Sequence, residues 1–296
     1  MPVIVVTSSS AGENGAGAGK TGVAAAIARH YAYLGRPVRL VRAPGEGHTA
    51  EDAAYFGSLA FAPSSPAEPV AITDPGGDEL VIAEADAATA AGISAAKIVW
   101  VAREKAPAKL PDGIAAAAVI VTDVKRTAEP VADGGVLTIR LNEDRCLAGF
   151  SVSEARAALN AEVLVQGDDG DPTCDHLVIA PISSDAGQPY FRRFPAKAVV
   201  VRYDRTDMHL AAMQTEVECL ILTGGRRPMD YLFDAATAKG VPVLLSRTDT
   251  ENTVIALEGI FDSTRFHGER KLDRMAGLLE GSGLYEALGL YEALDR

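Results

Sequence analysis

The residues best suited to chemistry stand near the N-terminus, in a run of glycines closed by a cation and a hydroxyl group. The candidate site residues in this run are Gly15, Gly17, Gly19, Lys20 and Thr21. Glycines let a backbone wrap closely around oxygen atoms, and exposed amides at the start of a helix attract anions. Lys20 would reach the β- and γ-phosphates of a nucleotide, and the Thr21 hydroxyl would ligate Mg²⁺. This segment therefore predicts a phosphate-binding loop.

The flanking residues predict the strand, loop and helix that such a site requires. Val3–Thr7 is a β-branched run, and Lys20–Leu34 carries Ala, Ile and Tyr at helical spacing. The spacing departs from GxxxxGK[ST], because Asn14 stands where that pattern has its first glycine. The plainer interpretation is a glycine-rich turn with a solvated lysine, and the flanking strand and helix argue against it.

Together with the segment IAEADA at residues 82–87, this start resembles the dethiobiotin-synthetase-like and cobyrinic-acid-diamide-synthase-like branch of P-loop proteins. The resemblance spans residues 1–150 and implies ATP and Mg²⁺ as cofactors. It also implies an acidic residue near the metal, for which Glu84 is the first candidate and Asp86 the second. The catalytic residues implied are Lys20 and Glu84, and the metal ligands implied are Thr21 and Glu84.

Two features of the loop depart from relatives of that branch. Gly15 stands where partition-type ATPases have an extra lysine. The inserted residues 11–14 lengthen the loop and bring in the Glu13 carboxylate, which we expect to be solvated. These departures leave open whether ATP is hydrolysed slowly or only sensed.

A second set of polar residues follows the expected strands of the C-terminal half. Its members are Ser183, Ser184, Asp204, Arg205, Thr206, Thr223, Gly224, Gly225, Asp249 and Thr250. Parallel α/β sheets place ligand crevices at the carboxyl ends of their strands, so we expect these residues to converge. Arg205 would grip a phosphate or carboxylate with two hydrogen bonds, and the glycines would offer backbone donors. The alternative left open is a structural Asp204–Arg205 ion pair beside a tight turn.

The run YDRTDMHLAAMQTEVECLILTGG, from Tyr203 to Gly225, closely resembles the DRTGG domain. A dethiobiotin-synthetase-like domain followed by a DRTGG domain is similar to the N-terminal regulatory half of long bacterial phosphotransacetylases. The catalytic acetyltransferase domain is expected to be absent, because the chain ends at Arg296. Acetyl transfer is therefore not expected.

Short apolar runs alternate with helical segments along the chain. This alternation predicts an α/β fold with a mainly parallel sheet of the P-loop NTPase type, flanked by helices, and a smaller α/β domain after it. The expected strands are Val3–Thr7, Pro37–Val41, Leu80–Ala83, Ile98–Val101, Val119–Thr122, Val136–Leu141, Leu177–Ala180, Ala198–Arg202, Cys219–Leu222 and Val241–Leu245. The expected domains are 1–150 with the phosphate loop, 151–262 as the DRTGG domain and 263–296 as a helical tail.

Local signals mark the second domain and the tail. Ser151 precedes Glu154 at the spacing of a capping box, so a helix should begin there. The tail repeats GLYEAL without change at Gly283–Leu288 and Gly289–Leu294. A period of six fits no coiled coil or solenoid, and we expect a frayed amphipathic helix.

Composition excludes several classes of function. A formal charge of −12 argues against nucleic acid as a partner, because phosphate backbones are bound by clustered Lys and Arg. The three cysteines show no CxxC spacing, so neither zinc nor a disulfide framework is indicated. No apolar stretch reaches the ~18 residues of a membrane span. We expect a cytoplasmic protein.

These features favour an ATP-binding regulatory protein of the sensor type, which couples its nucleotide state to a ligand or partner of the DRTGG domain. The alternative is an ATP-dependent ligase or synthase of the dethiobiotin or cobyrinic acid a,c-diamide type, which would activate a carboxylate and would need an organic-acid pocket. A third option is a scaffold that holds nucleotide only to stabilise its fold. Relatives of this loop class pair two protomers, so we expect a homodimer by analogy, with Arg192 and Arg193 near the neighbour's phosphate.

Overall fold

The computed structural model describes residues 3–9, 17–45, 47–73, 77–126, 135–168, 170–180, 187–261 and 263–289. The chain divides into two compact units. The first unit combines Met1–Asp144 with Lys271–Arg296, and the second unit is Arg145–Arg270. The second unit is thus inserted into the chain of the first, whereas the sequence predicts three consecutive segments.

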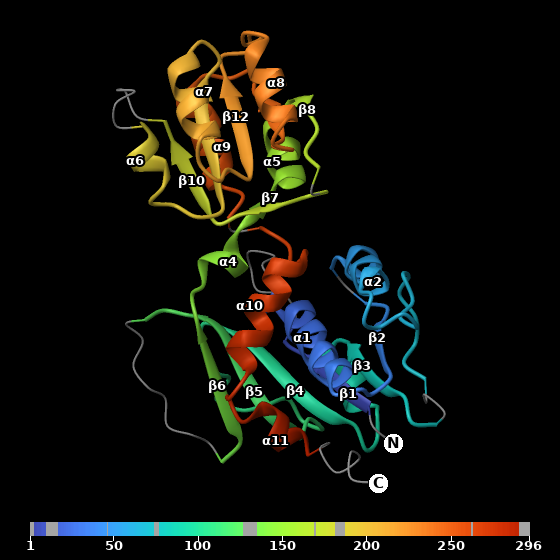
Figure 1. Ribbon diagram of the computed structural model, residues 1–296. Helices are drawn as coiled ribbons and strands as arrows, with labels where there is room; N and C mark the ends of the chain where they lie inside the picture. The colour runs from blue at the N-terminus through green and yellow to red at the C-terminus, as the bar shows by residue number, and fades with distance from the viewer. Residues whose placement is uncertain are drawn as a thin grey trace. The chain divides into compact units, whose positions relative to one another are not determined.

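A six-stranded sheet forms the centre of the first unit (Figure 1). Its strands are β1 (Val3–Thr7), β2 (Val38–Arg42), β3 (Leu80–Glu84), β4 (Lys97–Arg103), β5 (Ala116–Val124) and β6 (Leu137–Asn142). They follow the order β2-β3-β1-β4-β5-β6, and each neighbouring pair runs parallel. Because β1 and β3 are buried along their whole length, they appear in the sequence as continuous apolar runs. The predicted α/β architecture with a mainly parallel sheet is confirmed.

Within the described ranges, the strands are connected by the helices α1 (Lys20–Tyr33), α2 (Thr49–Ser58) and α3 (Ala87–Ala91). The small side chains of residues 24–26 and 28 on α1 are fully buried, which lets the helix lie close to β1, β2 and β3. The start of α1 at Lys20 agrees with the helix expected from the sequence. The strand-loop-helix arrangement is therefore present around the glycine run, of which Gly15 lies outside the described residues.

The C-terminal tail packs as part of the first unit. It forms α10 (Glu269–Leu279) and α11 (Leu284–Leu288), and α11 contacts β5 and β6. Leu284, Tyr285 and Leu288 are buried, and the Tyr285 ring stacks on the His30 ring of α1 at a centroid distance of 3.5 Å. The first copy of the repeat is thus a packed helix rather than a frayed one, because its apolar side chains share one face. Beyond Gly289 the second copy lies outside the described residues.

The second unit has a five-stranded sheet in the order β10-β11-β12-β13-β8. Its strands are β8 (Glu162–Val165), β10 (His176–Ile179), β11 (Lys197–Arg202), β12 (Cys219–Thr223) and β13 (Val243–Leu245). The strands from β10 to β13 run parallel, and β8 pairs antiparallel with β13. A separate pair joins β7 (Phe150–Ser151) to β9 (Thr173–Cys174).

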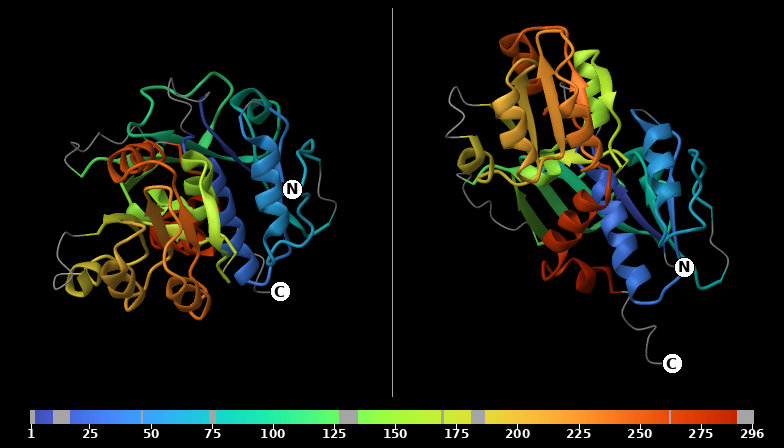
Figure 2. Two further views of the ribbon diagram at one scale, coloured as in Figure 1. Left: turned by 90° about the horizontal axis from the view of Figure 1, so that it is seen from above. Right: turned by 45° about the horizontal axis from the view of Figure 1, so that its top comes forward.

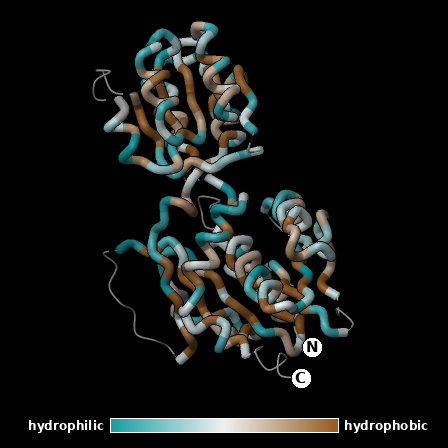
Figure 3. The backbone as a smooth tube through the Cα atoms, viewed as in Figure 1, coloured by the Kyte–Doolittle hydropathy of each residue, from teal (hydrophilic) through white to brown (hydrophobic). Residues whose placement is uncertain are grey.

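Helices cover both faces of this second sheet (Figures 1 and 2). These helices are α5 (Val152–Leu159), α6 (Gly187–Phe191), α7 (Thr206–Met213), α8 (Tyr231–Thr237) and α9 (Thr250–Glu258). The short helix α4 (Arg145–Ala148) precedes them and has no buried residue. One apolar core lies among α6, α7 and α8, and another lies among α5 and α9. Hydrophobic strand segments accordingly run through the inside of each unit in Figure 3. Among the described residues, no helix is long and apolar enough to cross a membrane.

The capping box predicted at Ser151 is present. The Ser151 hydroxyl accepts a hydrogen bond from the Glu154 amide at 3.1 Å, and the Glu154 carboxylate accepts one from the Ser151 amide at 2.8 Å. Such a box stabilises a helix start by about 1 kcal/mol. The short helix α5 therefore begins where the local sequence places it.

Candidate functional site

The amino end of α1 meets the carboxyl ends of three strands of the first unit. Gly19 caps the helix in the left-handed region, with φ 87° and no side-chain cap, so the amides of the first turn stay available to an anion. Thr122 on β5 donates its hydroxyl to the Ala18 carbonyl at 2.9 Å and lies within 3.4 Å of the position that a Gly19 Cβ would take. The end of the loop is therefore held against β5.

Lys20 points back to the end of β1. Its ammonium donates a hydrogen bond to the Ser8 hydroxyl at 3.0 Å, and Ser8 donates to the Ser9 carbonyl at 2.8 Å. Thr7 is fully buried, and its hydroxyl makes no hydrogen bond within the described part of the chain. Our sequence reasoning did not single out Thr7 and Ser8, although the change from β-branched residues to Thr-Ser-Ser was a usable signal.

Glu84 is a buried carboxyl group at the carboxyl end of β3. Burial raises its pKa to about 7, and the nearby Asp52 charge acts in the same direction. Arg42, whose Nε lies 3.7 Å from Glu84 Oε1, opposes that rise, as do Lys20 and the hydrogen bond from the Thr21 hydroxyl. The other oxygen, Oε2, has no hydrogen-bond partner among the residues described.

The second acidic candidate, Asp86, has a different task. Its carboxylate accepts a hydrogen bond from the Thr89 amide at 2.7 Å and caps α3. That bond holds the pKa of Asp86 below its usual range. Of the two candidates, Glu84 is therefore the one whose carboxyl group is hydrogen-bonded to Thr21.

The described side chains fit a hard cation bridged to phosphate. Mg²⁺ takes oxygen ligands and usually keeps several waters, so it is held by one or two protein oxygens together with phosphate. The Thr21 hydroxyl and the Glu84 carboxylate supply such oxygens. No group of three His, Cys, Asp or Glu residues within the described ranges forms an all-protein metal cage.

In the second unit, the Asp-Arg-Thr segment forms two exposed ion pairs, and neither joins Asp204 to Arg205. Arg202 pairs with Asp204 through Nε at 3.0 Å and through Nη2, which lowers the pKa of Asp204. Arg205 pairs with Asp207 through Nε at 3.0 Å and through Nη2 at 2.9 Å. The sequence left open an ion pair between Asp204 and Arg205. In the structure each arginine instead pairs with the aspartate two residues after it. A ligand anion at Arg205 would compete with Asp207.

The glycine turn is tied to the loop after β13. The Gly224 amide donates to the Thr248 carbonyl at 2.8 Å, and the Gly225 amide donates to the Ser246 carbonyl at 3.0 Å. Both residues have positive φ, and a Cβ on Gly224 would lie 3.0 Å from the Tyr203 ring. The expected backbone donors are thus occupied within the fold, which corrects that part of the sequence-based prediction.

Hydroxyl groups of the predicted set do converge beneath this turn. Thr223 and Thr250 share a hydrogen bond at 2.8 Å between their side-chain oxygens. Thr206 instead lies beside Met229, with 3.9 Å between Oγ1 and Sδ. Asp249 caps α9 by accepting from the Asn252 amide at 2.8 Å, and Ser183 and Ser184 lie outside the described residues.

Cations and aromatic rings gather beside the same turn. The Arg226 guanidinium lies 5.8 Å from the centroid of the Tyr203 ring and donates to its hydroxyl at 3.2 Å. Arg227 lies 4.5 Å from the centroid of the Phe233 ring. The aromatic partners of these two arginines are evident only in the packed structure. An exposed cation beside a ring suits an anionic ligand with a flat group.

Comparison with known proteins places a DRTGG domain at residues 154–260. The chain is also similar to the crystal structure of the CBS and DRTGG domains of the regulatory region of Clostridium perfringens pyrophosphatase, complexed with the activator diadenosine tetraphosphate. That match has 15% sequence identity and a TM-score of 0.36, and it covers 47% of this chain and 56% of the other. The predicted DRTGG domain is confirmed, and the likeness of the first unit to P-loop proteins stays a prediction.

Proposed function

We propose that this chain is an ATP-binding regulatory protein in which the first unit holds Mg²⁺·ATP and the second unit, with its DRTGG domain, responds to a ligand or partner. The observation that carries the proposal is the meeting of Lys20, the uncapped start of α1 and the buried Glu84 carboxyl at one edge of a parallel sheet. Ligands of parallel α/β sheets bind at that edge.

Three features support phosphate at this position. The fourteen-residue helix α1 directs its free amides and the positive end of its dipole at the loop. Lys20 adds a full charge there, and its one hydrogen bond among the residues described goes to the Ser8 hydroxyl. A neutral hydroxyl is a weak partner for an ammonium group, so a triphosphate would displace it with a gain in free energy.

The free-energy cost of a buried Glu84 carboxylate supports a cation beside it. A buried carboxylate is expensive unless it is paired and hydrogen-bonded, and one oxygen of Glu84 lacks a partner in the described chain. Mg²⁺ held by Thr21, Glu84 and the phosphates would offset that cost. The metal would also neutralise charge on the phosphates, and Lys20 would orient them.

Because the second unit is inserted into the first, the chain joins the two units at two points, after Asp144 and before Lys271. Asp144 ends the first stretch of the first unit, and Arg274 lies just after the chain returns to it. Arg274 donates to the Asp144 carboxylate from Nε at 2.8 Å. This ion pair clamps the point where the chain leaves and re-enters the first unit, so the second unit is tethered at both ends.

Titration of Mg²⁺·ATP into the full chain by calorimetry tests the proposal, with phosphate release measured in the same samples. Lys20→Ala should weaken binding by about 10- to 100-fold, because a charge-assisted hydrogen bond is worth about 1.5–3 kcal/mol. Lys109→Ala is the matched control, since Lys109 is exposed and pairs only with Asp112 among the described residues. Thr21→Val should remove the Mg²⁺ dependence of binding, and Thr21→Ser should keep it.

The outcomes separate the functions. Binding with little turnover supports the sensor, whereas rapid turnover that depends on an added carboxylic acid would support the ligase. Equal affinity in wild type and Lys20→Ala, or no binding of ATP at all, would overturn the phosphate site. Sedimentation with and without ATP tests the homodimer that analogy suggests.

A further inference from the structure

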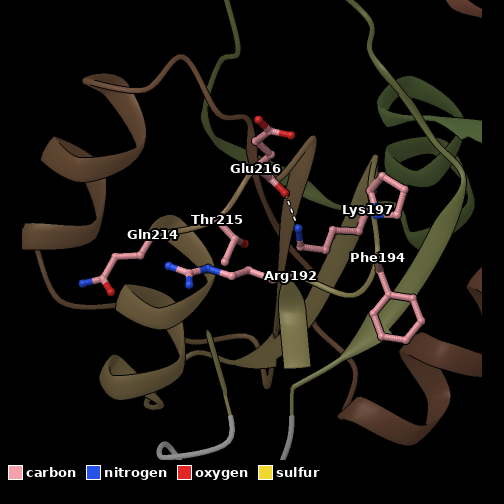
Figure 4. Close-up of a pocket in the computed structure, with 7 residues that line it drawn as sticks. Arg192, Phe194, Lys197, Gln214, Thr215 and Glu216 are labelled. Carbon is pink, nitrogen blue, oxygen red and sulfur yellow. Dashed lines mark hydrogen bonds between the residues drawn. The ribbon is translucent and has the colours of Figure 1, made fainter. Parts of the chain in front are cut away.

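A cavity of about 330 Å³ opens in the second unit at the edge of the sheet opposite the glycine turn (Figure 4). Lys197 begins β11, and the turn Gln214–Glu216 precedes β12, so both belong to the amino ends of parallel strands. Gly224 and Gly225 instead follow the carboxyl end of β12. The cavity is therefore separate from the candidate residues of the DRTGG motif.

Lys197 is the most unusual group in this cavity. The residue is 1% exposed, and its ammonium donates to the Glu216 carbonyl. That carbonyl is its one hydrogen-bond acceptor among the described residues, although an ammonium has three donors. Burial lowers the pKa of Lys197, which expresses the cost of keeping its charge there. An anion in the cavity would offset that cost.

Arg192 and Gln214 supply further donors at the wall. Figure 4 shows the Arg192 guanidinium extended toward Thr215 and Gln214. Neither the Arg192 guanidinium nor the Gln214 amide has a hydrogen-bond partner within the part of the chain that the structure describes. The Glu216 side chain points away from Arg192 and Lys197, while its carbonyl faces the lysine (Figure 4).

An apolar wall stands opposite these donors. Phe194 lines the cavity, and its ring packs against Tyr190 at 5.4 Å and His176 at 5.5 Å between centroids. These contacts fix the ring, so the wall is already formed before a ligand arrives. The charges of Glu216 and Glu218 both act on Lys197, so two cations stand near two carboxylates. This balance suits a ligand with a single negative charge better than one with two.

We propose that the cavity between Arg192, Lys197 and Phe194 binds a small organic carboxylate with a compact apolar body. The carboxylate accepts from the Arg192 guanidinium and the Lys197 ammonium, and the body packs on the Phe194 ring. A planar guanidinium matches a carboxylate through two parallel hydrogen bonds. The site goes beyond the nucleotide site proposed for the first unit, and its test contains no ATP, so the two proposals can fail independently.

Benzoate titrated into the ¹⁵N-labelled full chain, followed by two-dimensional NMR, tests this site. Shifts should concentrate on the backbone amides of Gln214 and Thr215 and should saturate. Arg192→Ala and Lys197→Met should each weaken benzoate by at least about tenfold, since each removes a charged donor. Should Lys197→Met fail to fold, the exposed Arg192→Ala variant still decides the outcome.

Two matched controls sharpen the test. Arg193→Ala removes the neighbouring exposed cation, which does not line this cavity, and Lys239→Ala removes the cation of an adjacent cavity of about 450 Å³. Both should bind benzoate as the wild type does. The proposal is overturned if benzoate shifts no signal of Gln214 or Thr215, if Arg192→Ala binds as tightly as Arg193→Ala, or if phenyl phosphate binds more tightly than benzoate.

Discussion

The His209 ring is held between Tyr231 and the end of β11, with Nδ1 3.0 Å from the Tyr231 hydroxyl and Nε2 2.9 Å from the Arg202 carbonyl. The ring is 1% exposed, and burial lowers its pKa. A neutral ring that donates from Nε2 and accepts at Nδ1 satisfies both contacts. His209 thus fixes α7, which begins at Thr206 directly after Asp204 and Arg205, to β11 and α8.

This relationship makes the stability of the second unit depend on pH. In the unfolded chain His209 takes up a proton near its usual pKa of 6.5, whereas the folded ring takes it up only at lower pH. Its contribution is therefore full above about pH 6.5 and is lost as the pH falls below that value. Melting temperatures between pH 5 and 7.5 should fall less steeply for His209→Gln than for wild type.

Glu84 should make the apo first unit less stable as the pH rises. Its folded pKa of about 7 lies above the unfolded value of 4.5, so the folded chain holds the proton more tightly. Stability is lost between these two values, by up to about 3 kcal/mol. Glu84→Gln should therefore gain in unfolding free energy over wild type from pH 5 to 7, measured without metal or nucleotide. The exposed Glu68→Gln serves as control, and a gap that stays constant with pH would contradict the assignment.

Gly224→Ala should destabilise the second unit more than a glycine substitution in open space. Gly224 has φ 93° and a new Cβ would meet the Tyr203 ring at 3.0 Å, whereas Gly170 has φ 68° and open space around it. Each substitution lowers the free energy of unfolding by about 1 kcal/mol, because alanine disfavours the left-handed backbone. Gly224→Ala lowers it further, because the Tyr203 ring must move. Urea denaturation should show a loss of about 2–3 kcal/mol for Gly224→Ala and about 1 kcal/mol for Gly170→Ala. Equal losses would mean that the ring does not constrain the turn.

Tyr285→Ala should lower the stability of the first unit by about 3 kcal/mol, because it removes a large buried ring and leaves a cavity beside His30. Thermal unfolding of the full chain measures the effect. Glu286→Gln, at the next position on the exposed side of α11, is the control and should change stability by less than about 0.5 kcal/mol. A melting temperature unchanged by Tyr285→Ala would show that the tail does not support the unit.

The sequence by itself determined the features that depend on neighbours along the chain. Strand β1 and helix α1 follow from a β-branched run and from helical spacing, and Ser151 caps α5 because its partner is three residues away. The DRTGG domain was recognisable from residues close together in the chain. Lys20 and Thr21 could be assigned to the start of a helix for the same reason.

Tertiary structure decided what depends on distant residues. The raised pKa of Glu84 arises from burial at β3 beside side chains of β2 and α2, and the choice of Asp207 rather than Asp204 for Arg205 depends on how the turn folds. Tail packing on β5 and β6 makes the second unit an insertion. The cavity at Lys197 forms only where the segments that follow α6 and α7 meet the start of β11. The burial of a side chain and the charged groups around it depend on segments that are far apart in the chain. Local sequence patterns do not specify these contacts.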